Sequence, residues 1–251
     1  RWWETATWTP VRSEEPGHTP AVRSLILYPT NALVEDQLTR IRRASRMLES
    51  DDPHCRIWFG RYTGETLGRV SSPKVGQRIS GGSVVSVEQT REIRSIIDEI
   101  DQMRDSGQSE RNLSLFQDPR HNELVHRWDF IQTPPDILVS NFAMLNAMLM
   151  RSFEAPIFDA TRNWLDSDSD NVFTLVIDEL HSYRGTAGTE TAMLIRKLLD
   201  RLGLSGDHPQ LRIIATSASL EDSDEGRKYL EQFFGAARNS FHITAGIAEE
   251  I

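Results

Sequence analysis

The feature that most constrains the fold is a short apolar run that ends in two carboxylates. Residues 172–177 read Val-Phe-Thr-Leu-Val-Ile, and Asp178 and Glu179 follow at once. A run so rich in β-branched and aromatic residues predicts a strand buried on both faces. In open α/β sheets the carboxyl ends of such strands line the ligand crevice. An Asp there can hold Mg²⁺ through water, and an adjacent Glu can activate a water that attacks a phosphate.

Composition excludes several classes of protein. The 251 residues suffice for a full core, and the 38% hydrophobic and 26% charged residues are typical of a globular domain. No apolar run is long enough to span a membrane, no signal pattern opens the chain, and the single Cys55 excludes an internal disulfide. We therefore expect a cytoplasmic protein with no membrane partner. The net charge of −9 argues against binding nucleic acid by overall charge, although arginines cluster within residues 40–46.

Short apolar runs alternate with amphipathic stretches along most of the chain. The predicted strands are residues 22–28, 56–59, 136–141, 172–177, 211–216 and 241–244. The predicted helices are residues 32–48, 88–103, 142–150, the stretch that ends near 202, and 222–234. This alternation predicts an α/β fold, with a mostly parallel sheet and helices on both of its faces.

Two regions depart from the alternation. Residues 1–21 form an irregular N-terminal arm, and we expect its three tryptophans to dock on a neighbouring surface. Residues 65–86 are rich in Gly, Ser and Pro and precede the predicted helix at 88–103, so we expect a helical and loop insertion over about residues 65–130. The main domain is then predicted to cover residues 22–251.

Small polar residues follow four of the strands, besides the carboxylates after the fifth. These groups are Pro29-Thr30-Asn31, Thr63-Gly64, Ser140-Asn141 and Ser217-Ala218-Ser219. Each one alone is more often an ordinary turn. Hydroxyls, amides and exposed backbone amides gathered at one edge of a sheet suit phosphate groups, including those of a nucleic-acid backbone.

In this order the motifs resemble motifs Ia, Ib, Ic, II and III of superfamily-two DEAD/DEAH-box helicases. They are residues 29–33, 62–64, 136–141, 178–181 and 217–219. The finer pattern resembles a bacterial branch with MrfA-like repair helicases and helicases of anti-phage systems such as DISARM and Druantia. It lies in residues 25–37, 59–64 and 178–185. The resemblance covers about residues 22–245 and implies part of a first RecA-like lobe.

Carried over residue by residue, the resemblance implies a nucleotide site and a strand site. Asp178 would hold the Mg²⁺ of bound ATP through water, Glu179 would activate the hydrolytic water, and His181 would face the nucleotide or motif III. Ser217 and Ser219 would couple hydrolysis to movement between lobes. The backbone of one nucleic-acid strand would contact a further set of residues, and the branch favours DNA over RNA. That set is Pro29, Thr30, Asn31, Thr63, Gly64, Ser140 and Asn141.

Two parts of the superfamily pattern are not in this sequence. No Gly-Lys pair of a P-loop occurs, and there is no second lobe with arginine fingers. An arginine finger contributes roughly 10³–10⁵ in rate in related NTPases, so we expect these residues alone to be inactive. We expect a piece of a larger helicase or translocase of phage defence or DNA repair, with defence-system subunits as further partners. A lobe that had lost its ATP site would have little reason to keep both Asp178 and Glu179.

Other patterns carry less weight. His121 and His126 are five residues apart, which on a helix turns them about 140° from each other and does not fit a zinc protease. Residues 166–171 lack the Gly and Glu of a Ca²⁺ loop. A metal nuclease would need a Lys on a following strand. The alternative that stays open is a non-catalytic nucleic-acid-binding or scaffold module of a defence complex.

Overall fold

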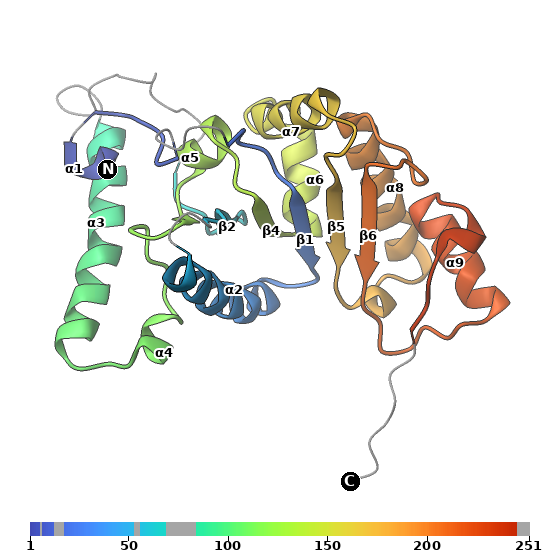
Figure 1. Cartoon of the computed structure of the whole chain (residues 1–251), viewed down its shortest axis with the longest axis horizontal. Coiled ribbons are helices and arrows are strands. Elements are labelled where there is room, and N and C mark those ends of the chain that lie inside the picture. The colour runs from blue at the N-terminus through green and yellow to red at the C-terminus, as the bar shows by residue number, and fades with distance from the viewer. Residues whose placement is uncertain (6, 13–17, 53–55, 69–83, 245–251) are drawn as a thin grey trace, which may run out of the picture.

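The computed structural model describes residues 1–5, 7–12, 18–52, 56–68 and 84–244 (Figure 1). Cys55 and much of the predicted Gly-, Ser- and Pro-rich loop, residues 69–83, lie outside the described residues. Within the described part, no helix combines the length and the apolar character needed to cross a bilayer.

One six-stranded sheet forms the centre of the described structure, in the order β3-β2-β4-β1-β5-β6. Its strands are β1 (Ser24–Tyr28), β2 (Phe59–Arg61), β3 (Glu123–Leu124), β4 (Ile137–Asn141), β5 (Phe173–Ile177) and β6 (Leu211–Ala215). Every pairing is parallel. The predicted α/β class with a parallel sheet is therefore confirmed, and the arrangement is compatible with a RecA-like lobe.

Register places equivalent residues of neighbouring strands side by side. Ile26 of β1 lies opposite Val139 of β4 and Val176 of β5, and Val176 lies opposite Ile214 of β6. Because all strands run the same way, their carboxyl ends meet at one edge of the sheet. That edge carries the residues on which the functional prediction depends.

Five of the described helices correspond to the predicted stretches, and those at residues 2–5, 110–113, 127–132 and 155–167 were not predicted. The described helices are α1 (Trp2–Thr5), α2 (Asn31–Asp51), α3 (Val84–Asp105), α4 (Glu110–Leu113), α5 (Arg127–Gln132), α6 (Phe142–Met150), α7 (Ala155–Ser167), α8 (Gly185–Leu202) and α9 (Asp224–Phe234), with 3-10 turns at Leu180–Ser182 and Arg238–Ser240. Local caps explain several ends. The Ser223 side chain accepts a hydrogen bond at the start of α9, and Gly203 and Gly235, at φ 76° and 70°, end α8 and α9.

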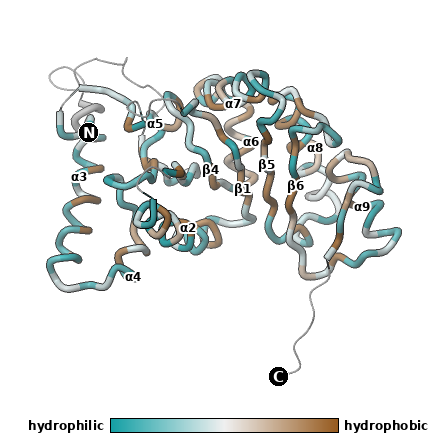
Figure 2. Tube along the Cα trace, viewed as in Figure 1, coloured by the Kyte–Doolittle hydropathy of each residue, from teal (hydrophilic) through white to brown (hydrophobic). Residues whose placement is uncertain are grey.

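The two faces of the sheet are covered unequally. On one face α2 packs on Tyr28, Phe59 and Val139. On the other face α6, α7 and α8 cover the inward residues of β1, β4 and β5 (Figure 1). On the α2 side, Val176 is only half-buried and Ile214 is 51% exposed, so apolar strand surface stays open among the described residues. Figure 2 shows hydrophobic residues, in brown, along the central strands.

The N-terminal arm docks by its aromatic residues. Trp2, Trp3 and Trp8 are buried, and Trp2 packs edge-on against Trp8, 5.1 Å between ring centroids. Trp128 of α5 and Ile93 of α3 complete this cluster. The arm includes the short helix α1, where the sequence predicted irregular structure. Whether residues 1–21 are a separate unit stays a prediction.

Some predicted elements differ from the structure. β2 begins at Phe59, whereas the sequence predicted a strand over residues 56–59, and residues 241–244 form no strand. Phe241 instead lies beside Phe234 of α9, 6.0 Å between centroids, so its apolar surface is covered without pairing to the sheet. β3 was not predicted, and it pairs with β2 from within residues 65–130. The extent of the predicted insertion stays a prediction.

Candidate functional site

The predicted site residues lie in spatial order along the carboxyl edge of the sheet. Neighbouring strands β2, β4 and β1 end at the small polar groups predicted to contact a strand. β5 ends at Asp178 and Glu179, and β6 is followed by Ser217 and Ser219. Along this edge, the residues predicted to contact a nucleic-acid strand therefore lie on one side and the residues predicted to hydrolyse ATP on the other. The two sets meet between β1 and β5.

Asp178 is held by the neighbouring strand end. The Thr216 hydroxyl donates a hydrogen bond to Oδ1 of Asp178, and the Asp178 amide donates to Leu27 O at 3.1 Å. Within the described structure, no donor reaches Oδ2. Asp178 is partly exposed, and the described residues hold no group of three or more His, Cys, Asp or Glu able to bind a metal. One anchored carboxylate that is open on its other oxygen fits Mg²⁺, which keeps several waters.

Glu179 has an unusual backbone. Its φ of 56° and ψ of 44° lie in the left-handed region, and it is the one non-glycine residue with positive φ in the described structure. The Glu179 amide donates to Thr216 Oγ1 at 3.2 Å, and the next amide, Leu180 N, donates to Thr216 O at 2.8 Å. Backbone strain of this kind gathers at functional sites. The two adjacent carboxylates have different partners, Thr216 for Asp178 and His181 for Glu179.

His181 connects the carboxylate of Glu179 with the segment after β6. Its Nε2 lies 3.1 Å from Glu179 Oε2, and its Nδ1 accepts a hydrogen bond from Ala218 N at 3.3 Å. Because an accepting Nδ1 carries no proton in the neutral ring, the proton is assigned to Nε2, which then donates to Glu179. His181 therefore contacts the segment that resembles motif III, and its role at the nucleotide or at motif III stays a prediction.

Two buried tyrosines lie near the carboxylates. Burial and the charge of Asp178 raise the pKa of Tyr28 to about 12. Burial, Asp178 and Glu179 likewise raise the pKa of Tyr183 above its usual value. The Tyr183 hydroxyl is buried and has no hydrogen-bond partner within the described structure. Both hydroxyls therefore stay neutral beside the carboxylates at ordinary pH.

A hydrogen bond between two side-chain amides joins the residues predicted to contact a nucleic-acid strand after β1 and β4. Asn141 Nδ2 donates to Asn31 Oδ1 at 2.6 Å, while Asn141 Oδ1 accepts from Met144 N at 2.8 Å and caps α6. Thr30 and Gly64 are exposed, and Pro29 is half-buried. Polar groups around the capped start of a helix are suited to a phosphate.

Two of the residues predicted to contact a nucleic-acid strand are buried in the protein. Ser140 is fully buried and its hydroxyl donates to Tyr62 O at 2.6 Å. Thr63 is fully buried, and its carbonyl accepts from Arg127 at 2.9 Å. The Ser140 side chain thus joins β4 to the chain after β2, and the Thr63 hydroxyl accepts from Glu65 N within that loop at 3.3 Å. The other residues predicted to contact a nucleic-acid strand are at least partly exposed: Pro29, Thr30, Asn31, Gly64 and Asn141.

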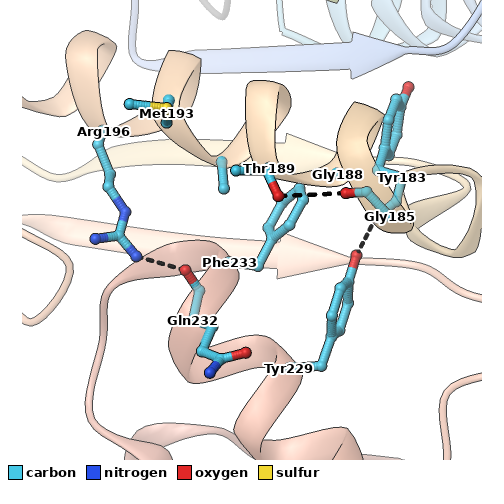
Figure 3. A pocket seen from close by; sticks show the side chains of 10 residues that line it. Tyr183, Gly185, Gly188, Thr189, Met193, Arg196, Tyr229, Gln232 and Phe233 are labelled. Carbon is cyan, nitrogen blue, oxygen red and sulfur yellow. Dashed lines mark hydrogen bonds between the residues drawn. The ribbon is translucent and has the colours of Figure 1, made fainter.

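A separate cavity of about 460 Å³ lies between α8 and α9. The Tyr229 hydroxyl donates to Tyr183 O at 2.7 Å across it, while the Tyr183 ring points away from it (Figure 3). The Arg196 guanidinium donates to Gln232 O at the far end (Figure 3). The Arg196 contact joins α8 to α9, and the Tyr229 contact joins α9 to the loop that follows Glu179.

Sequence reasoning missed two residues of the site. Thr216 was counted within a strand, and only its position just before Ser217 could have drawn attention to it. Arg184 donates to Ser219 Oγ at 3.0 Å and to Ser219 O at 3.3 Å, which links the loop after Glu179 to motif III. Both contacts join segments more than thirty residues apart in the chain, so local pattern cannot reveal them.

Comparison with known proteins gives one related sequence and a partial structural likeness. No family model matches the chain. A crystal structure of the DUF1998 helicase MrfA is 19% identical, with a TM-score of 0.45, over 86% of this chain and 22% of that one. A structure of the same helicase bound to DNA and AMPPNP is 20% identical, also with a TM-score of 0.45, over 86% of this chain and 20% of that one.

The sequence relative is far longer than the chain. The Druantia protein DruE of Escherichia coli (strain UMEA 4076-1) is 34% identical over 271 aligned residues. The match covers 92% of the chain but only 14% of DruE. The chain is therefore homologous to one segment of the Druantia protein DruE, which confirms its resemblance to that branch.

Proposed function

We propose that the chain is part of an ATP-dependent nucleic-acid motor, a helicase or translocase that acts on DNA in phage defence. In this proposal it carries the hydrolysis motif and the contacts to one strand, and it acts in the cytoplasm. The observation that carries the proposal is the order of groups along the sheet edge. Small polar residues that could contact a nucleic-acid backbone follow β2, β4 and β1, and two carboxylates follow the neighbouring strand β5.

In the hydrolysis half, the two carboxylates have different roles. Asp178 would bind Mg²⁺ through water by its open oxygen, since Thr216 holds the other one. Glu179 would accept the proton of the water that attacks the γ-phosphate, while ADP leaves with the bond electrons. His181 would keep the Glu179 carboxylate in place through its Nε2. Bound Mg²⁺ would neutralise charge that develops on the phosphates.

Five residues that are at least partly exposed would contact the backbone of one DNA strand. They are Pro29, Thr30, Asn31, Gly64 and Asn141. Ser140 and Thr63 would support them from within, because their side chains are buried. Contacts of this kind position a strand without reading its sequence. Neutral polar groups also fit a chain whose net charge is −9.

The remaining machinery would come from elsewhere in the full-length protein. A P-loop is needed to hold the phosphates and an arginine finger to stabilise the transition state. The chain spans 14% of DruE, which supports a larger protein with room for both. Ser217 and Ser219 would transmit hydrolysis to the second lobe. Other subunits of a defence system are the proposed protein partners.

The test is Glu179→Gln in the full-length protein. We expect DNA-stimulated ATP hydrolysis to fall by roughly a hundredfold or more, since a general base contributes that much, while AMPPNP still binds. Glu190→Gln is the matched control, because Glu190 is exposed on α8 and is not one of the predicted site residues. Wild-type turnover in Glu179→Gln would refute the hydrolytic role. DNA binding without any ATP binding would favour the non-catalytic module instead.

A further inference from the structure

The hydroxyl of Thr216 makes two hydrogen bonds of opposite sense at the proposed site. It donates to the Asp178 carboxylate and accepts from the Glu179 amide at 3.2 Å. A hydroxyl has one donor and two acceptor positions, so it can serve both groups at once. One side chain of β6 thus contacts both residues of the carboxylate pair.

The hydrogen bond from the Glu179 amide to the Thr216 hydroxyl involves the residue with the left-handed backbone. A non-glycine residue in the left-handed region is less stable than in the right-handed one unless its surroundings hold it there. Around Glu179 they do so through Thr216: the hydroxyl accepts from Glu179 N, and the carbonyl accepts from Leu180 N at 2.8 Å. Without the hydroxyl, the Glu179 amide loses its hydrogen-bond acceptor, while the Leu180 N to Thr216 O bond and the Ser182 N to Glu179 O bond remain.

The Glu179 side chain is held from the same segment. His181 lies between Glu179 Oε2 and Ala218 N, two residues after Thr216. Residues 216–218 therefore hold the backbone of Glu179 on one side and its carboxylate, through His181, on the other. Thr216 is exposed, so its hydroxyl is not required to fill the core.

We propose that Thr216 is a positioning residue for ATP hydrolysis: its hydroxyl orients the Asp178 carboxylate and holds Glu179 in the left-handed conformation that aims its carboxylate at the hydrolytic water. The inference rests on the hydrolytic function proposed above. Thr216 touches no reacting atom. It acts through the two residues that do, so its loss lowers the rate of the chemical step more than it weakens nucleotide binding.

The experiment compares hydroxyl deletions in the full-length protein. Thr216→Val keeps the shape of the side chain, Thr216→Ala is a second deletion, and Thr216→Ser keeps the hydroxyl. We expect kcat for DNA-stimulated hydrolysis to fall roughly ten- to a hundredfold in the two deletions, as for a hydrogen bond to a charged group, with KM for ATP unchanged and with Ser restoring the rate. Thr174→Val, on the same face at the far end of β5, is the matched control.

A second readout does not depend on turnover. By hydrogen–deuterium exchange, a peptide spanning residues 178–183 should gain one faster-exchanging amide in Thr216→Val, and not in Thr216→Ser or Thr174→Val. Wild-type kcat and exchange in both deletions overturn the proposal, as does an equal loss in Thr216→Ser. If Glu179→Gln is inactive while Thr216→Val is normal, only the role of Thr216 fails. Normal turnover in Glu179→Gln removes the hydrolytic function itself.

Discussion

The stability of the docked arm should decrease as pH rises through neutrality, because of one buried carboxylate. Asp129, in the first turn of α5, is 1% exposed. Its Oδ1 accepts from Val11 N at 2.9 Å and its Oδ2 from Trp2 Nε1 at 3.2 Å. These bonds and the charge of Arg1 favour the ionised form, but burial outweighs them and raises the pKa of Asp129 to about 7.

The sign follows from proton binding. The folded state holds the Asp129 proton up to a pKa of about 7, whereas the ordinary value is 3.8. The folded state therefore binds more protons in that window, and the free energy of unfolding falls as pH rises through it. This contribution is complete below the ordinary pKa and is lost as pH passes 7. Between pH 5 and pH 7 two pKa units correspond to about 3 kcal/mol.

The assay is urea unfolding at pH 5, 6, 7 and 8, followed by tryptophan fluorescence, for wild type and Asp129→Asn. The amide can still accept from Val11 N but no longer titrates, and the lost bond from Trp2 costs about 1 kcal/mol at every pH. We expect Asp129→Asn to gain on wild type by about 3 kcal/mol from pH 5 to pH 8. A constant difference between the two proteins across the four pH values would refute the reasoning.

Three further predictions concern single positions. Burial lowers the pKa of His126 to about 3, so its contribution to stability is present above its ordinary pKa of 6.5 and is lost as pH falls towards 3. His126→Asn keeps the cap of α5 but does not titrate in this range. In the same urea series, its free energy of unfolding should therefore fall less than that of wild type as pH decreases. Gly60→Ala would place a Cβ 2.5 Å from Cζ of Phe130 and should lower the free energy of unfolding by about 1–3 kcal/mol in urea denaturation. Asn141→Ser retains a cap for α6 but loses the amide donor to Asn31. In fluorescence titrations, binding of single-stranded DNA should weaken by roughly fivefold while ATP affinity is unchanged. Unchanged DNA affinity would contradict the proposed contact between Asn141 and the DNA strand.

The sequence by itself determined most strands of the sheet and the helices α2, α3, α6, α8 and α9. The strands at 173–177 and 211–215 were predictable because unbroken β-branched runs have few other stable conformations, and α6 and α9 because periodicity and caps agree. The parallel class followed from the alternation of strands and helices. The site residues were located by type and order, since polar groups follow the strands in the sequence.

The tertiary structure alone decided how these elements meet. It decided that β4 lies between β2 and β1, that two-residue β3 joins the sheet, and that Ser140 points inward. It also brought Thr216 onto Asp178 and Glu179. Such contacts depend on the register between strands far apart in the chain, which is set by packing of the whole core. Local preferences act only between sequence neighbours, so they carry no information about these contacts.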